Sequence, residues 1–163
     1  MTEAQVIRRL VVGVDGSEHS GRALAWTIRV AKSVDAEVVA VFAIAPPNYL
    51  EYADSAGIVP PELDPAWREQ ITKEFERQWC SPLTEADVRH RHLVRDGRPA
   101  EVIARVADET DADLVVVGRR GRGGFAELVL GSVSGELAHH CGRPLVLIAT
   151  PKAESPKALG DGG

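Results

Sequence analysis

Cysteine is scarce in this sequence, and its spacing excludes two classes of small protein. Among 163 residues there are two cysteines, Cys80 and Cys141, with neither a Cys-x-x-Cys pair nor a zinc-type Cys–His spacing. A disulfide scaffold or a zinc knuckle needs more sulfur at closer spacing. We therefore expect both cysteines to be reduced thiols in a cytoplasmic protein.

Long apolar runs are missing as well, which excludes a membrane-spanning helix. Such a helix needs roughly 20 apolar residues, and the runs here are far shorter. The N-terminal segment carries Glu3, Arg8 and Arg9 and has no apolar stretch of the kind found in a signal peptide. The net charge of −5 disfavours a nonspecific nucleic-acid coat protein. We expect a protein that binds neither membranes nor nucleic acid.

The overall composition is that of a globular domain. Hydrophobic residues make up 44% of the chain and charged residues 26%, a balance typical of folded proteins. The length favours a single domain, which we place at residues 1–150. Residues 151–163 carry three glycines and two prolines and no apolar stripe, so we expect a disordered C-terminal tail there.

Apolar patterning predicts strands and helices in alternation. Strands are expected at residues 9–15, 37–44, 88–94, 113–118 and 144–150, and helices at 17–34, 65–79, 99–107 and 132–141. Ser17 and the pair Asp64-Pro65 are expected to start their helices. Five prolines between Pro46 and Pro65 predict a long surface loop. The order of elements predicts an α/β fold with a parallel sheet and helices on both faces.

The most informative segment is the glycine-rich stretch after the fourth predicted strand. Ligands of open parallel sheets bind beyond the carboxyl ends of the strands, and glycines there let backbone amides approach a ligand closely. These glycines are Gly118, Gly121, Gly123 and Gly124. The segment Gly131-Ser132-Val133-Ser134 then opens a helix, whose amides and dipole favour an anion. The two serine hydroxyls can donate to phosphate oxygens.

The charge of this segment agrees with a phosphate ligand. Arg119, Arg120 and Arg122 lie in a stretch without acidic residues, and guanidinium groups bind phosphate well. The alternative is that these arginines are solvated surface residues. The Gly-Ser pair that opens the helix favours phosphate. Other phosphate motifs fail, because the chain has no Gly-Lys-Ser/Thr and residues 13–17 lack the GxGxxG spacing.

The glycine spacing resembles that of a known family. Gly118-x2-Gly121-x9-Gly131-Ser132 matches G-x2-G-x9-G-[ST], the nucleotide motif of universal stress proteins of the ATP-binding type. The resemblance extends to residues 11–17, 97–100 and 143–148. It therefore spans Arg9 to Thr150 and is weakest between residues 46 and 87.

This resemblance implies a five-stranded parallel sheet in the order 3-2-1-4-5 and a set of nucleotide-binding residues. It places Asp15 on the nucleoside and the backbone of Ala43 at the adenine edge, with Phe42-Ala43 replacing the more usual His-Val pair. The remaining residues that the resemblance assigns to ribose and phosphates, or to the strand ends beside them, are Gly13, Val117, Gly118, Arg120, Gly121, Gly131, Ser132, Val133 and Ser134. Asp15 has an alternative role, which is to cap the first helix together with Ser17.

The resemblance also implies a function and a partner. We expect an ATP-binding regulatory or stress-response protein rather than an enzyme, with Mg²⁺ accompanying the triphosphate. Slow ATP hydrolysis or phosphotransfer, or an interaction module with a vestigial pocket, are the alternatives. Family members commonly form homodimers through the last strand, here Leu145, Val146, Leu147 and Ile148. The alternative is a last strand covered by its own helices.

The histidines offer a weaker candidate site. His90 and His92 share one face of a predicted strand, an arrangement compatible with a metal. No carboxylate or cysteine lies nearby at the spacing of a metal ligand. We expect them to be surface histidines, and we predict no metal ligand and no catalytic residue in the chain.

Overall fold

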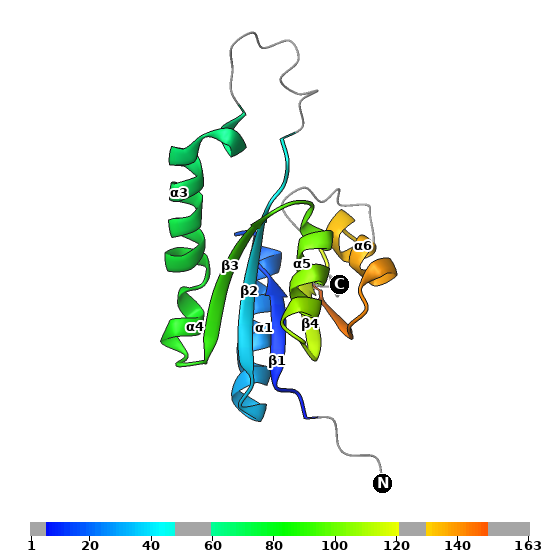
Figure 1. Cartoon of the computed structure of the whole chain (residues 1–163). Helices are drawn as coiled ribbons and strands as arrows, with labels where there is room; N and C mark the ends of the chain where they lie inside the picture. The colour runs from blue at the N-terminus through cyan, green and yellow to red at the C-terminus, as the bar shows by residue number, and fades with distance from the viewer. Residues whose placement is uncertain (1–5, 48–59, 121–129, 150–163) are drawn as a thin grey trace, which may run out of the picture.

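The structure is a computed structural model that describes residues 6–47, 60–120 and 130–149 (Figure 1). The strands are β1 (Arg9–Gly13), β2 (Glu37–Ile44), β3 (His90–Asp96), β4 (Leu114–Gly118) and β5 (Leu145–Ile148). The α-helices are α1 (Glu18–Val34), α3 (Pro65–Glu74), α4 (Ser81–Glu85), α5 (Pro99–Glu109) and α6 (Ser132–His140). A 3₁₀ turn, η1 (Pro61–Leu63), precedes α3, and a π turn, η2 (Phe75–Trp79), follows it.

The strands form one parallel sheet in the order β3-β2-β1-β4-β5, which confirms the predicted fold class and strand order. In the centre of the sheet Val11 lies in register with Val39 on one side and Val115 on the other. All three side chains are fully buried. This is the burial that continuous apolar strands predict, because helices cover both faces of the sheet.

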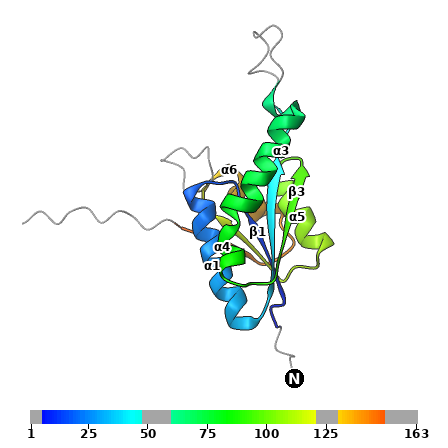
Figure 2. The same cartoon turned by 90° about the vertical axis from the view of Figure 1, so that its left-hand side faces the viewer.

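The two faces of the sheet have different helical covers. Helices α1, α3 and α4 lie on one side and α5 on the other (Figure 2). The first face forms a core cluster that includes Leu24, Phe75 and Leu83. The second forms a cluster in which Val102 and Leu137 pack from α5 and α6. The protein therefore has two cores separated by one sheet.

Both predicted helix starts are confirmed. Ser17 Oγ accepts a hydrogen bond from Ser20 N at 3.2 Å, and Asp64 Oδ1 accepts one from Ala66 N at 2.9 Å. Pro65 occupies the first position of α3, where its missing N–H leaves no acceptor unsatisfied.

The predicted helix at residues 65–79 is present, but its last five residues form a π turn instead of an α-helix. The α-helix ends at Glu74, and Cys80 N donates to Phe75 O at 3.0 Å to close the π turn. A short helix that the pattern did not predict, α4, follows with Pro82 in its first turn. Apolar residues at i+4 intervals cannot distinguish an α turn from a π turn, because the two place the stripe on nearly the same face.

An aromatic cluster fastens this segment to the sheet. The ring centroid of Phe42 on β2 lies 5.7 Å from that of Phe75 and 5.2 Å from that of Trp79, the latter pair edge to face. Phe75 is fully buried and Phe42 is nearly so. Such aromatic pairs add about 0.5–1.5 kcal/mol beyond the burial of their area. The cluster therefore fixes where η2 crosses β2.

Replacing Phe75 with alanine tests the importance of this cluster. We expect Phe75→Ala to lower the free energy of unfolding by about 3–5 kcal/mol, because it leaves a cavity between η2 and β2. Urea denaturation measures the change. As a control, Val34→Ala alters an apolar residue exposed on α1 and should change stability by less than about 0.5 kcal/mol. A similar small loss for Phe75→Ala would contradict the packing described here.

Candidate functional site

The candidate site lies at the carboxyl ends of β1 and β4, which are neighbours in the sheet. The chain leaves β1 for α1 on the first core face, whereas the helix after β4, α6, packs into the second core. The winding of the fold therefore reverses between these two strands. Open α/β sheets bind their ligands at such a reversal.

The end of β1 is closed by a compact turn around Asp15. Asp15 Oδ1 accepts a hydrogen bond from Ser17 N at 2.9 Å, and Asp15 N donates to Ser20 Oγ at 3.2 Å. Gly16 supplies the positive φ, 79°, that this turn needs. The carboxylate of Asp15 thus holds Ser17, whose own hydroxyl caps α1. Ser20, which the sequence pattern did not mark, belongs to the same turn.

Ala43 carries its backbone polar groups to the same end of the sheet. Val41 O accepts from Val14 N at 2.9 Å and therefore faces β1, whereas Ile44 O accepts from Gly97 N at 3.0 Å and faces β3. Backbone groups of a strand alternate between its two neighbours, so Ala43 faces the side of β1. The register between the two strands ends at Gly13 and Val41. The N–H and C=O of Ala43 therefore face the space beyond β1.

Gly118 and Gly13 are required by packing inside the protein. A Cβ on Gly118 would lie 2.9 Å from the backbone C and O of His19, at the start of α1. A Cβ on Gly13 would lie 2.7 Å from Ile103 Cδ1 and 3.1 Å from Val117 Cγ1. The sequence pattern assigned these glycines to a ligand. The structure shows that each also lets a helix approach its strand end.

The start of α6 is joined directly to the end of β4. Gly131 N donates to Arg119 O at 2.8 Å, and Ser134 Oγ donates to the same carbonyl at 2.7 Å. The side chain of Ser134 is buried, so its hydroxyl holds the helix in place. Among the described residues no side chain caps the helix and no acceptor takes the N–H of Ser132, Val133 or Ser134. These amides form an anion-favouring helix start.

Two arginines follow Gly118 at this point. The Nε atoms of Arg119 and Arg120 are both buried, and Arg119 Nε has no hydrogen-bond partner within the described ranges. A buried N–H of a cation without an acceptor is costly, so an anion near Arg119 is favoured. Gly121 and the rest of the glycine-rich segment to residue 129 lie outside the described residues, as does the predicted tail at 151–163.

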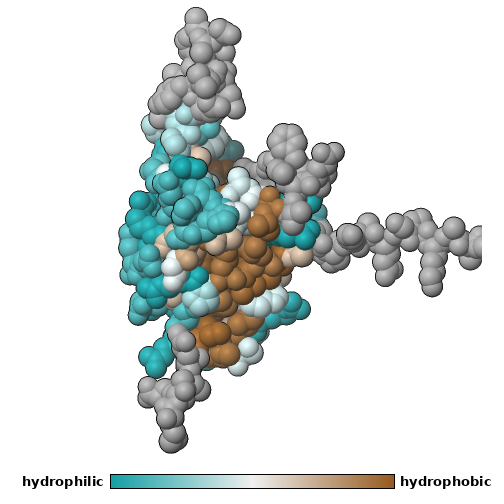
Figure 3. All heavy atoms as spheres, turned by 90° about the vertical axis from the view of Figure 1, so that its right-hand side faces the viewer, coloured by the Kyte–Doolittle hydropathy of each residue, from teal (hydrophilic) through white to brown (hydrophobic). Residues whose placement is uncertain are grey.

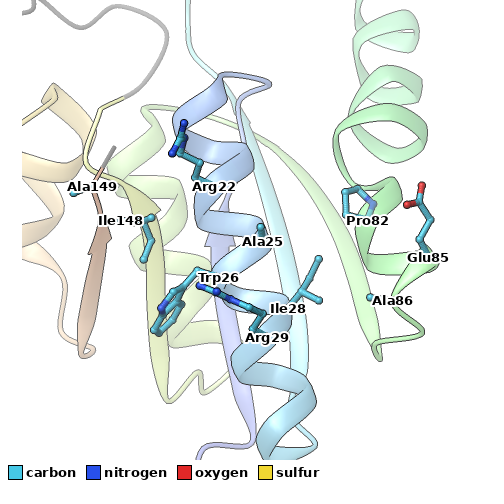
Figure 4. Close-up of a pocket in the computed structure, with 10 residues that line it drawn as sticks. All are labelled: Arg22, Ala25, Trp26, Ile28, Arg29, Pro82, Glu85, Ala86, Ile148 and Ala149. Carbon is cyan, nitrogen blue, oxygen red and sulfur yellow. The ribbon is translucent and has the colours of Figure 1, made fainter. Parts of the chain in front are cut away.

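A separate groove of about 680 Å³ runs along the outer side of α1 (Figure 4). Trp26 and Ile148 line it near β5, and Pro82 lines it on α4. It shares no residue with the predicted nucleotide site.

No group of three or more metal-type ligands occurs among the described residues, and no described helix is long and apolar enough to cross a membrane.

The fold and these strand ends define a doubly wound α/β protein with a helix start that favours an anion at its topological reversal. The chain belongs to the universal stress protein family, whose model matches residues 7–149. Universal stress protein MJ0531 of Methanocaldococcus jannaschii is 28% identical over 151 residues, which cover 90% of this chain and 85% of that relative.

Solved structures share the fold. The hypothetical protein MJ0577 superposes with a TM-score of 0.74 at 17% identity, over 91% of this chain and 99% of that one. A universal stress protein in complex with cAMP superposes with a TM-score of 0.62 at 25% identity, over 89% of this chain and 98% of that one.

The packing of Gly118 can be tested separately from any ligand. We expect Gly118→Ala to destabilise the protein by about 1–3 kcal/mol, because the new Cβ meets backbone atoms that cannot rotate away. The matched control is Gly21→Ala within α1, where nothing lies within 4 Å of the added Cβ. That change should stabilise the protein by about 0.5–1 kcal/mol. Thermal unfolding measures both; equal effects would refute the close approach of α1 to β4.

Proposed function

We propose that the protein is a regulatory, ATP-binding member of the stress-response machinery of the cytoplasm. The observation that carries the proposal is the contact of Gly131 N with Arg119 O, which brings the start of α6 to the end of β4. It assembles the two ends of the G-x2-G-x9-G-[ST] motif in space. The relative in complex with cAMP supports an adenine nucleotide as the ligand.

The phosphates take the side of the site formed by β4 and α6. The amides of Ser132, Val133 and Ser134 donate to phosphate oxygens, and Arg120 adds a positive charge. Ser132 is exposed and its hydroxyl is available as a further donor, whereas the Ser134 hydroxyl is held by Arg119 O. Ser134 therefore contributes its N–H alone. A triphosphate brings Mg²⁺ with it.

The nucleoside takes the side formed by β1 and β2. Asp15 is held at the end of β1 by its hydrogen bond from Ser17 N, and a carboxylate there accepts from ribose hydroxyls. The backbone of Ala43 faces the same space and offers one donor and one acceptor to the edge of adenine. Gly118 forms the boundary between the nucleoside side and the phosphate side.

We propose binding without turnover as the mode of action. Phosphoryl transfer needs a carboxylate that holds the metal and a group that positions the nucleophile. Asp15 is engaged in its turn, and the acid next nearest in the motif, Glu127, lies outside the described residues. Binding therefore acts through shape or assembly, and a steady release of ADP by the purified protein would replace this proposal with slow hydrolysis.

The proposed partner is a second copy of the chain, joined through β5. This strand is at the edge of the sheet, and Leu145, Val146, Leu147 and Ile148 are all half-buried. Apolar side chains gather on this side of the molecule (Figure 3). An exposed apolar edge strand is a template for pairing with another chain, so an antiparallel β5–β5 contact would cover it.

Replacing Gly131 tests the phosphate path. Gly131 has φ −70° and ψ 166°, which valine adopts readily. We expect Gly131→Val to abolish ATP binding in calorimetric titration while the protein stays folded, because the side chain fills the phosphate path. Gly135→Ala, in the same helix and facing open space, should bind ATP as the wild type does. Wild-type affinity in Gly131→Val would move the site elsewhere.

Replacing Arg120 distinguishes contacts to the phosphates from contacts to the nucleoside. We expect Arg120→Ala to weaken ATP binding more than adenosine binding, since the lost charge faces the phosphates. Arg105→Ala removes an exposed arginine of α5 that pairs with Glu109 and should leave both affinities unchanged. An equal loss for ATP and adenosine in Arg120→Ala would rule out the assigned role of this arginine.

A lysine on β5 tests the dimer. We expect the wild type to sediment as a dimer and Leu147→Lys to sediment as a monomer, because a charge on an edge strand opposes pairing. Val34→Lys places the same charge on the exposed side of α1 and should leave the dimer intact. A monomeric wild type would exclude the proposed partner without affecting the nucleotide site.

A further inference from the structure

Two histidines on the edge strand β3 lie against the π turn η2. His90 and His92 are two residues apart, so they share one face of the strand, and their ring centroids are 4.9 Å apart. The ring of His92 meets that of Phe75 at 5.7 Å, edge to face. Both histidines are half-buried, so they are less exposed than the surface histidines that the sequence predicts.

The two rings have different hydrogen-bonding partners. His90 Nδ1 lies 2.7 Å from Val88 O, and since a carbonyl only accepts, Nδ1 carries the hydrogen. His92 Nε2 is buried and has no partner within the described ranges. A neutral imidazole can leave one nitrogen as an acceptor without a donor. A protonated ring would instead place an N–H and a positive charge there with no acceptor.

The charged groups around His92 divide into opposing sets. Burial lowers the pKa of His92 most, and the positive charge of His90 lowers it further, whereas Glu76 on η2 raises it. Glu74 is engaged by the indole N–H of Trp79 at 3.2 Å. Cys80 stays neutral, because burial raises the pKa of its thiol to about 12. The net effect is a His92 pKa below its usual range.

The remaining elements around the pair add no carboxylate at the rings. Strand β2 places Val38 opposite His90 and Ala40 opposite His92. Arg91 points to the other face, where its Nε lies 2.7 Å from Glu37 Oε1. Among the described residues, two groups therefore act on the charge that protonation of His92 would create. His90 repels it and Glu76 attracts it.

We propose that His92 makes the contact between β3 and η2 an acid-sensitive latch, which releases the segment α3–η2–α4 from the sheet in mild acid. Protonation places a charge on a half-buried ring, whose Nε2 atom is fully buried, beside Phe75 and a second histidine. The other polar tie of this segment, Arg68 to Asp96 at 2.8 Å, is between half-buried and exposed groups, and such pairs contribute about 0–1 kcal/mol. That pair adds little to the apolar packing of Phe75 and Leu83, so it does not offset a charge placed at His92.

The sign of the effect follows from linkage. The pKa of His92 is lower in the folded protein than in the unfolded chain, where it is about 6.5. The unfolded or released form therefore binds more protons as the pH falls through that value. The stabilisation is complete above this range and is lost as the pH decreases toward the folded-state pKa.

Amide hydrogen exchange tests the latch residue by residue. We expect residues 65–85 to lose protection between about pH 7.5 and about pH 5.5, the range in which histidines titrate, after correction for intrinsic exchange rates. Helices α1 and α5 should keep theirs. His92→Phe retains an aromatic ring that does not titrate and should make protection of residues 65–85 independent of pH. His140→Phe changes an exposed histidine on α6 and should respond like the wild type.

Two outcomes would overturn the latch. One is equal protection of residues 65–85 at both pH values in the wild type; the other is the same acid loss in His92→Phe as in the wild type. Should His92→Phe fail to fold, an NMR titration of the His92 ring in the wild type decides instead. A ring that titrates at the usual pKa of an unperturbed histidine contradicts the proposal.

Discussion

The backbone N–H and C=O of Arg119 join three elements around the candidate site. Its N–H donates to Ile148 O at 2.9 Å and extends the pairing of β4 with β5, while its carbonyl accepts from Gly131 N and Ser134 Oγ. The preceding residue, Gly118, lies against the backbone of His19 in α1. Two residues thus hold an edge strand and the starts of two helices, and the candidate site is the space that these elements surround.

Sequence reasoning predicted the sheet well, because its physical signals are local. A strand buried on both faces must be apolar throughout, so β1, β2 and β4 are visible as runs such as Leu114–Gly118. The helix caps at Ser17 and Asp64 are equally local. The strand order came from the family resemblance, since no single strand carries that information.

What the sequence could not predict depends on tertiary contacts. The π turn at Phe75–Trp79 follows from packing against Phe42, which lies far away in the chain. Phe75 also packs against His92, which is half-buried although its spacing alone suggested a surface residue. In the site, the motif marked Gly118 and Ser134 for a ligand, whereas a helix backbone and a carbonyl occupy their immediate surroundings. A glycine motif predicts that other atoms approach the backbone closely, but it does not distinguish atoms of a ligand from atoms of the protein.

Strand β2 connects the two proposals, because Phe42 packs into the aromatic cluster and Ala43 next to it faces the candidate site.

The measurement that tests the central claim most directly is calorimetric titration of the purified wild type with ATP, after any co-purified nucleotide has been removed. Binding through the strand ends and the start of α6 predicts saturable, one-site binding at micromolar concentrations or below. No heat of binding for ATP, AMP or cAMP would contradict the account and leave the glycine spacing as a requirement of packing alone.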